Sequence, residues 1–286
     1  MKNINRRSFI NKSAMGLGGA MALSNIPNLL RAAHTVKMPL GFQSFPIRDM
    51  MGKDFLGTLK TMAGFGYKFV EMCSPVGYKD IGFGFAAKMT TADIKKTIHD
   101  SGLDCHSCHF GKAELTPEKI DASIQFAHDL GLTQMICSTF WLPKTATLKD
   151  YYDDADKLNK AAEKIKAAGM VTGFHNHDME FVMLEGQLIY DALMSHFDAS
   201  LIKMQFQTEV IQLGYKASTY FNKYPGRFIS SHLSDWTADK KQVPVGQGII
   251  DWKEFFAAAK TGGVKNIFVE MDFNTFEASA KYLKSL

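Results

Sequence analysis

The chain has 286 residues, 46% of them hydrophobic and 22% charged, with a formal net charge of +4. A chain of this length can bury a full hydrophobic core as one domain, and it contains no uninterrupted apolar run long enough to span a membrane. The first 33 residues carry five basic and no acidic side chains, so 28 basic and 29 acidic residues remain beyond them. This balance gives no support to nucleic-acid binding.

Residues 1–33 have the layout of an export signal. Arg6 and Arg7 stand beside Ser8 and Phe9, and a weakly hydrophobic stretch rich in Gly and Ala follows at 13–30. A basic start, an apolar middle and a small-residue exit are typical of secretory signals, and the paired arginines resemble a twin-arginine signal. We expect the mature chain, 34–286, to be exported to the periplasm, with no membrane association once the signal is removed.

From residue 37 on, short apolar runs alternate with longer helical patterns, and several helices end at a glycine. The expected strands are 37–45, 68–73, 103–110, 133–138, 170–175, 201–207, 227–232 and 266–270. The expected helices are 54–66, 91–102, 117–130, 148–168, 187–197, 215–224, 252–260 and 275–286. Alternation of this kind predicts a parallel sheet, and eight units in about 250 residues predict a single-domain (β/α)₈ TIM barrel. The alternative is a doubly wound open sheet, which the absence of a Gly-x-Gly-x-x-Gly motif after the first strand disfavours for nucleotide binding.

The segment Cys105-His106-Ser107-Cys108-His109 matches the haem-attachment pattern C-x-x-C-H. It lies within an expected strand, where Cys105 and Cys108 would point to opposite faces and could not hold one haem edge. We therefore interpret the two cysteines as small buried hydrophobic residues.

Polar side chains end six of the expected strands. His175, Asn176 and His177 follow the apolar run 170–174, and alternation along a strand points His175 and His177 to one side. The other strand ends carry Glu71, His109, Gln207, His232 and Glu270. Because the strand ends of a TIM barrel meet at one face, these side chains predict a convergent active site.

The chain resembles the sugar phosphate isomerase/epimerase family, whose barrel is xylose-isomerase-like. The motifs that carry the resemblance are Phe-Val-Glu (69–71), His-Asn-His-Asp-x-Glu-Phe (175–181), Tyr-Pro-Gly-Arg-Phe (224–228), Val-Gly-Gln-Gly-x-Ile-Asp-Trp (245–252) and Val-Glu-x-Asp (269–272). The resemblance implies an enzyme acting on a small-molecule sugar or glycoside.

The resemblance also implies one divalent cation, most readily Mn²⁺ or Zn²⁺, with Co²⁺ or Mg²⁺ as alternatives. Its ligands would be His175, Gln207, His232 and Glu270. Two of these positions depart from the family pattern, because His175 replaces a usual glutamate and Gln207 a usual aspartate. A glutamine carbonyl oxygen can still bind a cation, but the site has two fewer negative charges.

The family usually has a His-x-Lys-Asp motif on the seventh strand, and here Ser234 replaces the lysine. The resemblance therefore implies no cation at this position, which disfavours a phosphorylated substrate. Proton abstraction next to a carbonyl, through an enediolate-type intermediate, requires a base within hydrogen-bonding reach. The candidates are His177, His109, Glu71, Glu180 and Glu270. Imidazoles titrate near neutral pH, so we favour His177 or His109.

Three functions remain open at this stage. The first is a metal-dependent isomerase or epimerase of an unphosphorylated sugar or keto-sugar. The second is a lyase or hydratase that acts on 3-keto-glycosides by β-elimination. The third is a carbohydrate-binding protein without catalysis.

Overall fold

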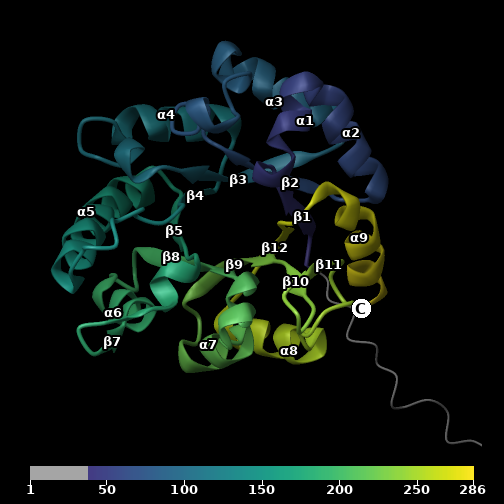
Figure 1. Ribbon diagram of the computed structural model, residues 1–286. Coiled ribbons are helices and arrows are strands. Elements are labelled where there is room, and N and C mark those ends of the chain that lie inside the picture. The colour runs from purple at the N-terminus through teal and green to yellow at the C-terminus, as the bar shows by residue number, and fades with distance from the viewer. Residues whose placement is uncertain (1–37) are drawn as a thin grey trace, which may run out of the picture. The chain divides into compact units, whose positions relative to one another are not determined.

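The computed structural model describes residues 38–286, and the expected signal at 1–33 lies outside them (Figure 1). Within these residues a closed barrel of eight parallel strands forms the centre, in the order β1-β12-β9-β8-β5-β4-β3-β2. The barrel strands are β1 (Leu40–Gln43), β2 (Phe69–Cys73), β3 (Asp104–Phe110), β4 (Gln134–Cys137), β5 (Val171–His175), β8 (Ile202–Gln207), β9 (Phe228–Leu233) and β12 (Asn266–Val269). The predicted TIM barrel is confirmed. The open-sheet alternative is wrong, because β1 pairs with both β2 and β12 and leaves no edge.

Helices surround the barrel on its outside (Figure 1). They are α1 (Arg48–Lys53), α2 (Phe55–Phe65), α3 (Thr91–Asp100), α4 (Ile120–Leu130), α5 (Leu148–Ala167), α6 (Ile189–His196), α7 (Ala217–Lys223), α8 (Trp252–Gly262) and α9 (Phe276–Ser285). Short 3₁₀ helices follow several strands, among them η6 (Lys112–Glu114), η7 (Asp178–Phe181) and η8 (Thr208–Leu213). The region expected as one helix at 187–197 instead begins with β7 (Gln187–Leu188), which pairs with β6 (Met183–Leu184) in a hairpin.

Helix α5 shows how sequence pattern becomes packing. Thr147 precedes its first turn and accepts a hydrogen bond from the backbone N–H of Asp150, while the Asp150 carboxylate accepts from the Thr147 N–H. This capping box begins the helix. Leu158, Ala162 and Ile165, at helical spacing, are buried against the barrel.

The loop after β9 is organised by a single buried carboxylate, that of Asp235. It accepts hydrogen bonds from the backbone N–H groups of Gly246 and Gly248 and from the indole of Trp252, at 2.9, 3.1 and 2.8 Å. A Cβ on Gly248 would lie 2.1 Å from Asp235 Oδ1, so only glycine allows this approach. The Val-Gly-Gln-Gly-x-Ile-Asp-Trp motif is therefore a scaffold for the loop.

All four cysteines are free and buried, and Cys105 and Cys108 lie on β3. Their burial in a barrel strand confirms them as small core residues. Across residues 38–286, no helix combines the length and the apolar character needed to cross a membrane.

Candidate metal and proton-transfer site

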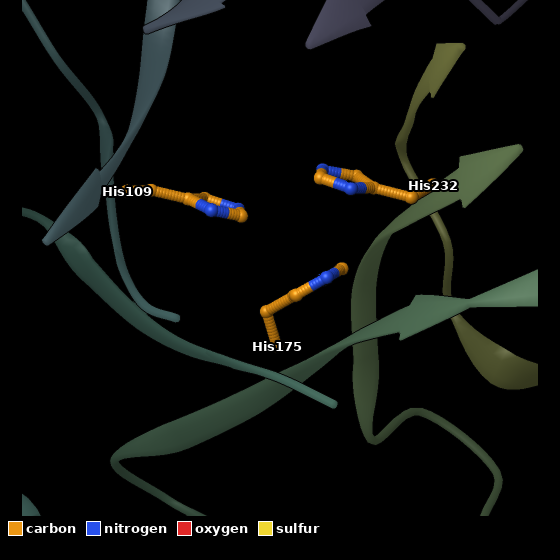
Figure 2. A group of neighbouring side chains, drawn as sticks. All are labelled: His109, His175 and His232. Atoms are coloured by element: carbon orange, nitrogen blue, oxygen red, sulfur yellow. The ribbon is translucent and has the colours of Figure 1, made fainter. Parts of the chain in front are cut away.

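Three histidines from three different strands converge inside the C-terminal end of the barrel. His109 comes from β3, His175 from the end of β5 and His232 from β9 (Figure 2). One ring nitrogen from each lies within 4.8 Å of the other two. The rings of His109 and His232 stack at 5.1 Å, and the ring of His175 lies 4.9 and 4.3 Å from them. All three side chains are buried. The register of distant strands has thus built a compact imidazole triad.

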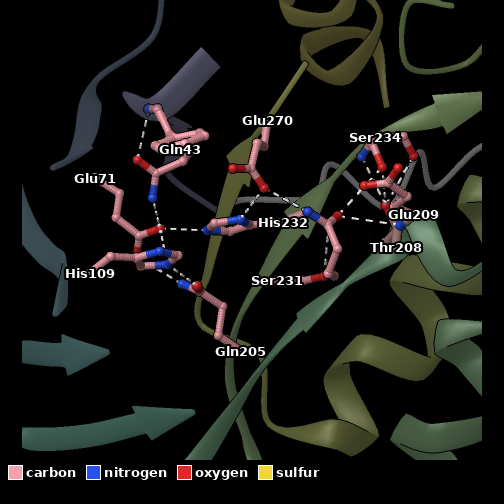
Figure 3. Close-up of polar contacts among 12 residues, drawn as sticks. Gln43, Glu71, His109, Gln205, Thr208, Glu209, Ser231, His232, Ser234 and Glu270 are labelled. Carbon is pink, nitrogen blue, oxygen red and sulfur yellow. Dashed lines mark hydrogen bonds and ion pairs between the residues drawn. The ribbon is translucent and has the colours of Figure 1, made fainter. Parts of the chain in front are cut away.

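The carboxylate of Glu71 lies beside His109 and His232 and is fully buried (Figure 3). Glu71 pairs across the sheet with Ser107, two residues before His109, so it lies deeper in the barrel than His109. Its Oε2 accepts from Gln43 Nε2 at 2.8 Å and from His232 Nε2, and it lies 3.2 Å from His109 Nε2. Its Oε1 accepts from Ser107 Oγ and Gln205 Nε2. Burial favours the neutral acid, but His109 and His232 outweigh it and lower the pKa of Glu71 well below its usual value. With its lone pairs occupied, Glu71 supports the histidines and is poorly suited to act as the base.

His232 is held between two carboxylates. Its Nε2 faces Glu71, and its Nδ1 lies 2.8 Å from Glu270 Oε2. Burial disfavours a charged imidazole, yet Glu270 and Glu71 together raise the pKa of His232 to about 9. Glu270 remains 19% exposed, so it links this buried charge network to the mouth of the barrel.

Gln207 lies at the predicted strand end, but its amide presents the nitrogen, and not the oxygen, to Glu270. Nε2 of Gln207 donates to Glu270 Oε2 at 2.6 Å. The carbonyl oxygen Oε1 instead accepts from the backbone N–H of Glu209 at 3.3 Å and from Ser234 Oγ at 3.4 Å. The oxygen that was expected to bind a cation is therefore already hydrogen-bonded, and His109 completes the imidazole group in its place. Alternation predicted which face Gln207 would occupy, whereas its rotamer depends on the loop after β8.

His177 lies at the mouth, beyond His175, with their ring centroids 4.8 Å apart. The indole of Trp141 packs against His177 at 4.9 Å and is itself 58% exposed. Burial lowers the pKa of His177 to about 4, so its imidazole is neutral at pH 7. Its Nδ1 is buried without a hydrogen-bond partner among the described residues. A neutral imidazole at the mouth of the barrel can accept a proton, or a hydrogen bond from a substrate hydroxyl.

The triad fits a divalent metal ion. His109 Nε2 bonds to Gln205 Oε1 at 2.7 Å, so the lone pair of this ring can reside on Nδ1. His232 is hydrogen-bonded through both ring nitrogens, to Glu71 and to Glu270, so a cation would have to replace the proton on its Nδ1. His175 Nδ1 is buried and has no hydrogen-bond partner within the described part of the chain. Burial and the neighbouring histidines also lower the pKa of His175 well below its usual value, which keeps the ring neutral. A neutral imidazole such as that of His175 is a favoured ligand for Zn²⁺ and related cations.

Two side chains that the sequence reasoning did not single out complete the site. Gln205 accepts from His109 and donates to both Glu71 and Ser230, at 2.8 and 2.9 Å for the two donated bonds. Gln43 of β1 donates to Glu71 from the other side. Both are buried amides on barrel strands, and Gln205 has the same parity as Gln207 along β8. Buried polar residues in the register of a predicted site are the signal that identifies them.

The comparison with protein families finds that residues 59–286 match the xylose isomerase-like TIM barrel, so the chain belongs to this family. The resemblance seen in the sequence motifs is confirmed at that level. A comparison with curated proteins finds no significant match.

Solved structures share the fold at low sequence identity. A sugar phosphate isomerase/epimerase from Parabacteroides distasonis ATCC 8503 is 23% identical with a TM-score of 0.73, over 89% of this chain and 96% of that one. An L-ribulose 3-epimerase is 17% identical with a TM-score of 0.61, over 86% of each chain. The IOLI protein, with a bound zinc atom, is 12% identical with a TM-score of 0.62, over 87% of this chain and 94% of that one.

Proposed function

We propose that this protein is a divalent-metal-dependent isomerase or epimerase of an unphosphorylated sugar or keto-sugar. The triad His109–His175–His232, with Glu270 beside it at the strand ends, is the observation that carries the proposal. A divalent cation supplies Lewis-acid polarisation of a carbonyl when it is bound. His109, His175 and His232 would hold it, with Glu270 adjacent; Zn²⁺ or Mn²⁺ suits this donor set best.

The remaining groups divide the proton-transfer work. His177 is neutral at pH 7 and its imidazole accepts the proton next to the substrate carbonyl. Glu71 stays ionised and holds His232 by its Nε2. Glu270, half-buried, orients the Nδ1 side of His232 and faces the mouth. Ser234, where related motifs have a lysine, leaves no cation there for a phosphate group.

Metal analysis followed by isotope exchange tests the proposal. We expect stoichiometric Zn²⁺ or Mn²⁺ in the purified protein and its loss in the double variant His232→Ala/Glu270→Ala. Incubation of the metal-loaded protein in D₂O with free keto-sugars should place deuterium next to the carbonyl. If the protein binds sugars but holds no metal and places no deuterium in them, it would instead be a non-catalytic carbohydrate-binding protein.

A second candidate function is cleavage or hydration of 3-keto-glycosides by β-elimination. It is favoured by the neutral side chains of His175 and Gln207, where the family resemblance leads one to expect carboxylates. Release of an aglycone from 3-keto-glycosides, with deuterium incorporation, would establish this reaction. Exchange into free keto-sugars without any cleavage of 3-keto-glycosides would exclude it.

We also propose that residues 1–33 direct export to the periplasm, from the paired Arg6 and Arg7 before an apolar stretch. A reporter fused behind residues 1–33 should be exported, and replacement of both arginines by lysine should retain it in the cytoplasm. Export of the lysine variant at the original level would contradict a twin-arginine route.

A further inference from the structure

The same arrangement of a buried glutamate occurs twice at the mouth of the barrel. Glu114 follows His109 by five residues after β3, and Glu180 follows His175 by five residues after β5. Each glutamate is the third residue of a short 3₁₀ helix, η6 and η7 respectively. Two of the three triad histidines are thus followed by the same device at the same spacing.

Glu114 joins the loop after β3 to the loop after β2. Its Oε2 accepts the backbone N–H of Gly111 at 2.8 Å, and its Oε1 accepts the hydroxyl of Ser74. The backbone N–H of Ser74 in turn donates to the carbonyl oxygen of His109 at 2.8 Å. A Cβ on Gly77 would lie 1.9 Å from Glu114 Oε2, so the loop closes tightly over the carboxyl.

Glu180 joins the loop after β5 to the loop after β4 through the same atoms. Its Oε2 accepts the backbone N–H of His177 at 2.7 Å, and its Oε1 accepts the hydroxyl of Thr139. Thr139 has φ of 80° and Trp141 has φ of 49°, in the left-handed region that disfavours β-branched and bulky residues. The strained loop places the Trp141 ring against His177. Strain of this kind persists only where surrounding contacts hold it, and the Thr139–Glu180 bond is such a contact.

Both carboxyls are buried, with 5% and 0% exposure, and neither has a salt-bridge partner among residues 38–286. They therefore contribute hydrogen bonds to loops and not charge to the triad. We propose that Glu114 and Glu180 are a matched pair of positioning residues. Glu114 holds His109, and Glu180 holds His177 together with the end of β5 that carries His175, each by tying the loop behind its strand to the loop of the preceding strand.

The test uses the full chain and variants of the two glutamates. Glu114→Ala and Glu180→Ala remove the bridge. Glu114→Gln and Glu180→Gln keep it, because the amide oxygen can accept the backbone N–H and the amide nitrogen can donate to the hydroxyl oxygen. Glu185→Ala is the control: Glu185 is an exposed glutamate that also bridges two segments, because it accepts the N–H of Leu148 at the start of α5, but it ties no loop to His109 or His177.

Two measurements read out the positions of the rings. One is nuclear Overhauser contact between the rings of His109 and His175 and between those of Trp141 and His177, in metal-free protein. The other is the affinity for Co²⁺, followed by its visible absorption. We expect each alanine variant to lose its own ring contact and to bind Co²⁺ about tenfold more weakly. The glutamine variants should stay within about threefold of the wild type, and the control should be unchanged.

Ring contacts and Co²⁺ affinity that survive both alanine substitutions would overturn the inference. Glutamine variants that fail as badly as the alanine variants would also overturn it, because charge and not bridging would then matter. If an alanine variant does not fold, Ser74→Ala and Thr139→Val remove the hydroxyl that donates to each carboxyl, and Ser74→Ala also removes the acceptor for the N–H groups of Val76 and Gly77. Both should give a smaller loss of the same kind; no change in either would again contradict the proposal.

The metal-binding arm alone rests on the proposed function. A wild-type protein that binds no Co²⁺, Zn²⁺ or Mn²⁺ would defeat the proposed function, while the ring contacts in metal-free protein would still decide the role of the glutamates.

Discussion

Buried glutamates at the base and at the rim of this site differ in their charge, although they lie in the same barrel. Glu71, at the base, receives five donors, two of them histidines, and its pKa is lowered. Glu180, at the rim, receives a hydroxyl and a backbone N–H but no cation, and burial raises its pKa to about 7. Burial opposes ionisation in both. The number and charge of the donors decide whether a buried carboxyl stabilises a cation or joins two loops.

Replacing Glu71 should produce the largest effect, because it removes the carboxylate that pairs with His232 deep in the site. Glu71→Ala leaves His232, normally charged, with only Glu270 as its partner, and we expect a loss of about 3–5 kcal/mol in the free energy of unfolding. Urea denaturation of the metal-free protein measures this. A loss below about 1 kcal/mol would contradict the idea that the ion pair between Glu71 and His232 stabilises the fold strongly.

Glu180→Gln should change the pH dependence of stability. The pKa of Glu180 in the folded state, about 7, lies above the value of 4.5 expected when unfolded. Its contribution is therefore fully present below about pH 4.5 and is lost as the pH rises through about 7, by about 3 kcal/mol. Groups near Glu180 include Asp178, Cys137 and Tyr151.

The glutamine variant should lack this loss, so it should gain stability relative to the wild type between pH 5 and 8. Urea midpoints of the two proteins across this range, compared as a difference, cancel the titration of all other groups. A constant difference across the range would contradict a raised pKa at the rim.

Gln207→Glu should sharpen the comparison by adding a carboxylate next to Glu270, nearer the mouth of the barrel than Glu71. In metal-free protein the new charge faces Glu270, whose Oε2 now accepts from the amide at 2.6 Å. We expect a loss of about 1 kcal/mol in stability without metal, together with about tenfold tighter Co²⁺ binding. Unchanged Co²⁺ affinity would mean that position 207 lies outside the reach of the cation.

Glu114→Gln should give the smallest effect, in the same direction as Glu180→Gln. Burial also raises the pKa of Glu114, but hydrogen bonds from Ser74 and from the backbone of Gly111 and Gly77 oppose this. We expect it to lose less stability with rising pH than Glu180 does. A larger effect than that of Glu180 would reverse the order of donor strength that the structure implies.

Part of the site could be predicted from local sequence. His175, His232 and Glu270 were expected at strand ends, and each lies there, because alternation along a strand and the parallel register determine the face and the end that a residue occupies. His109 was expected there as an acid or base, yet its ring stacks on His232 as part of the triad. That contact joins residues 123 positions apart, and no local pattern encodes it.

The sequence by itself determined the alternation of strands and helices, the barrel class and the set of polar residues at its mouth, since these follow from periodicity and from the chemistry of each side chain. The tertiary structure alone decided their roles. It turned the amide of Gln207 away, made Glu71 an ionised support and Glu180 a loop bridge. The reason is physical: protonation and rotamer depend on donors and burial contributed by strands far apart in the chain, which become neighbours only when the barrel closes.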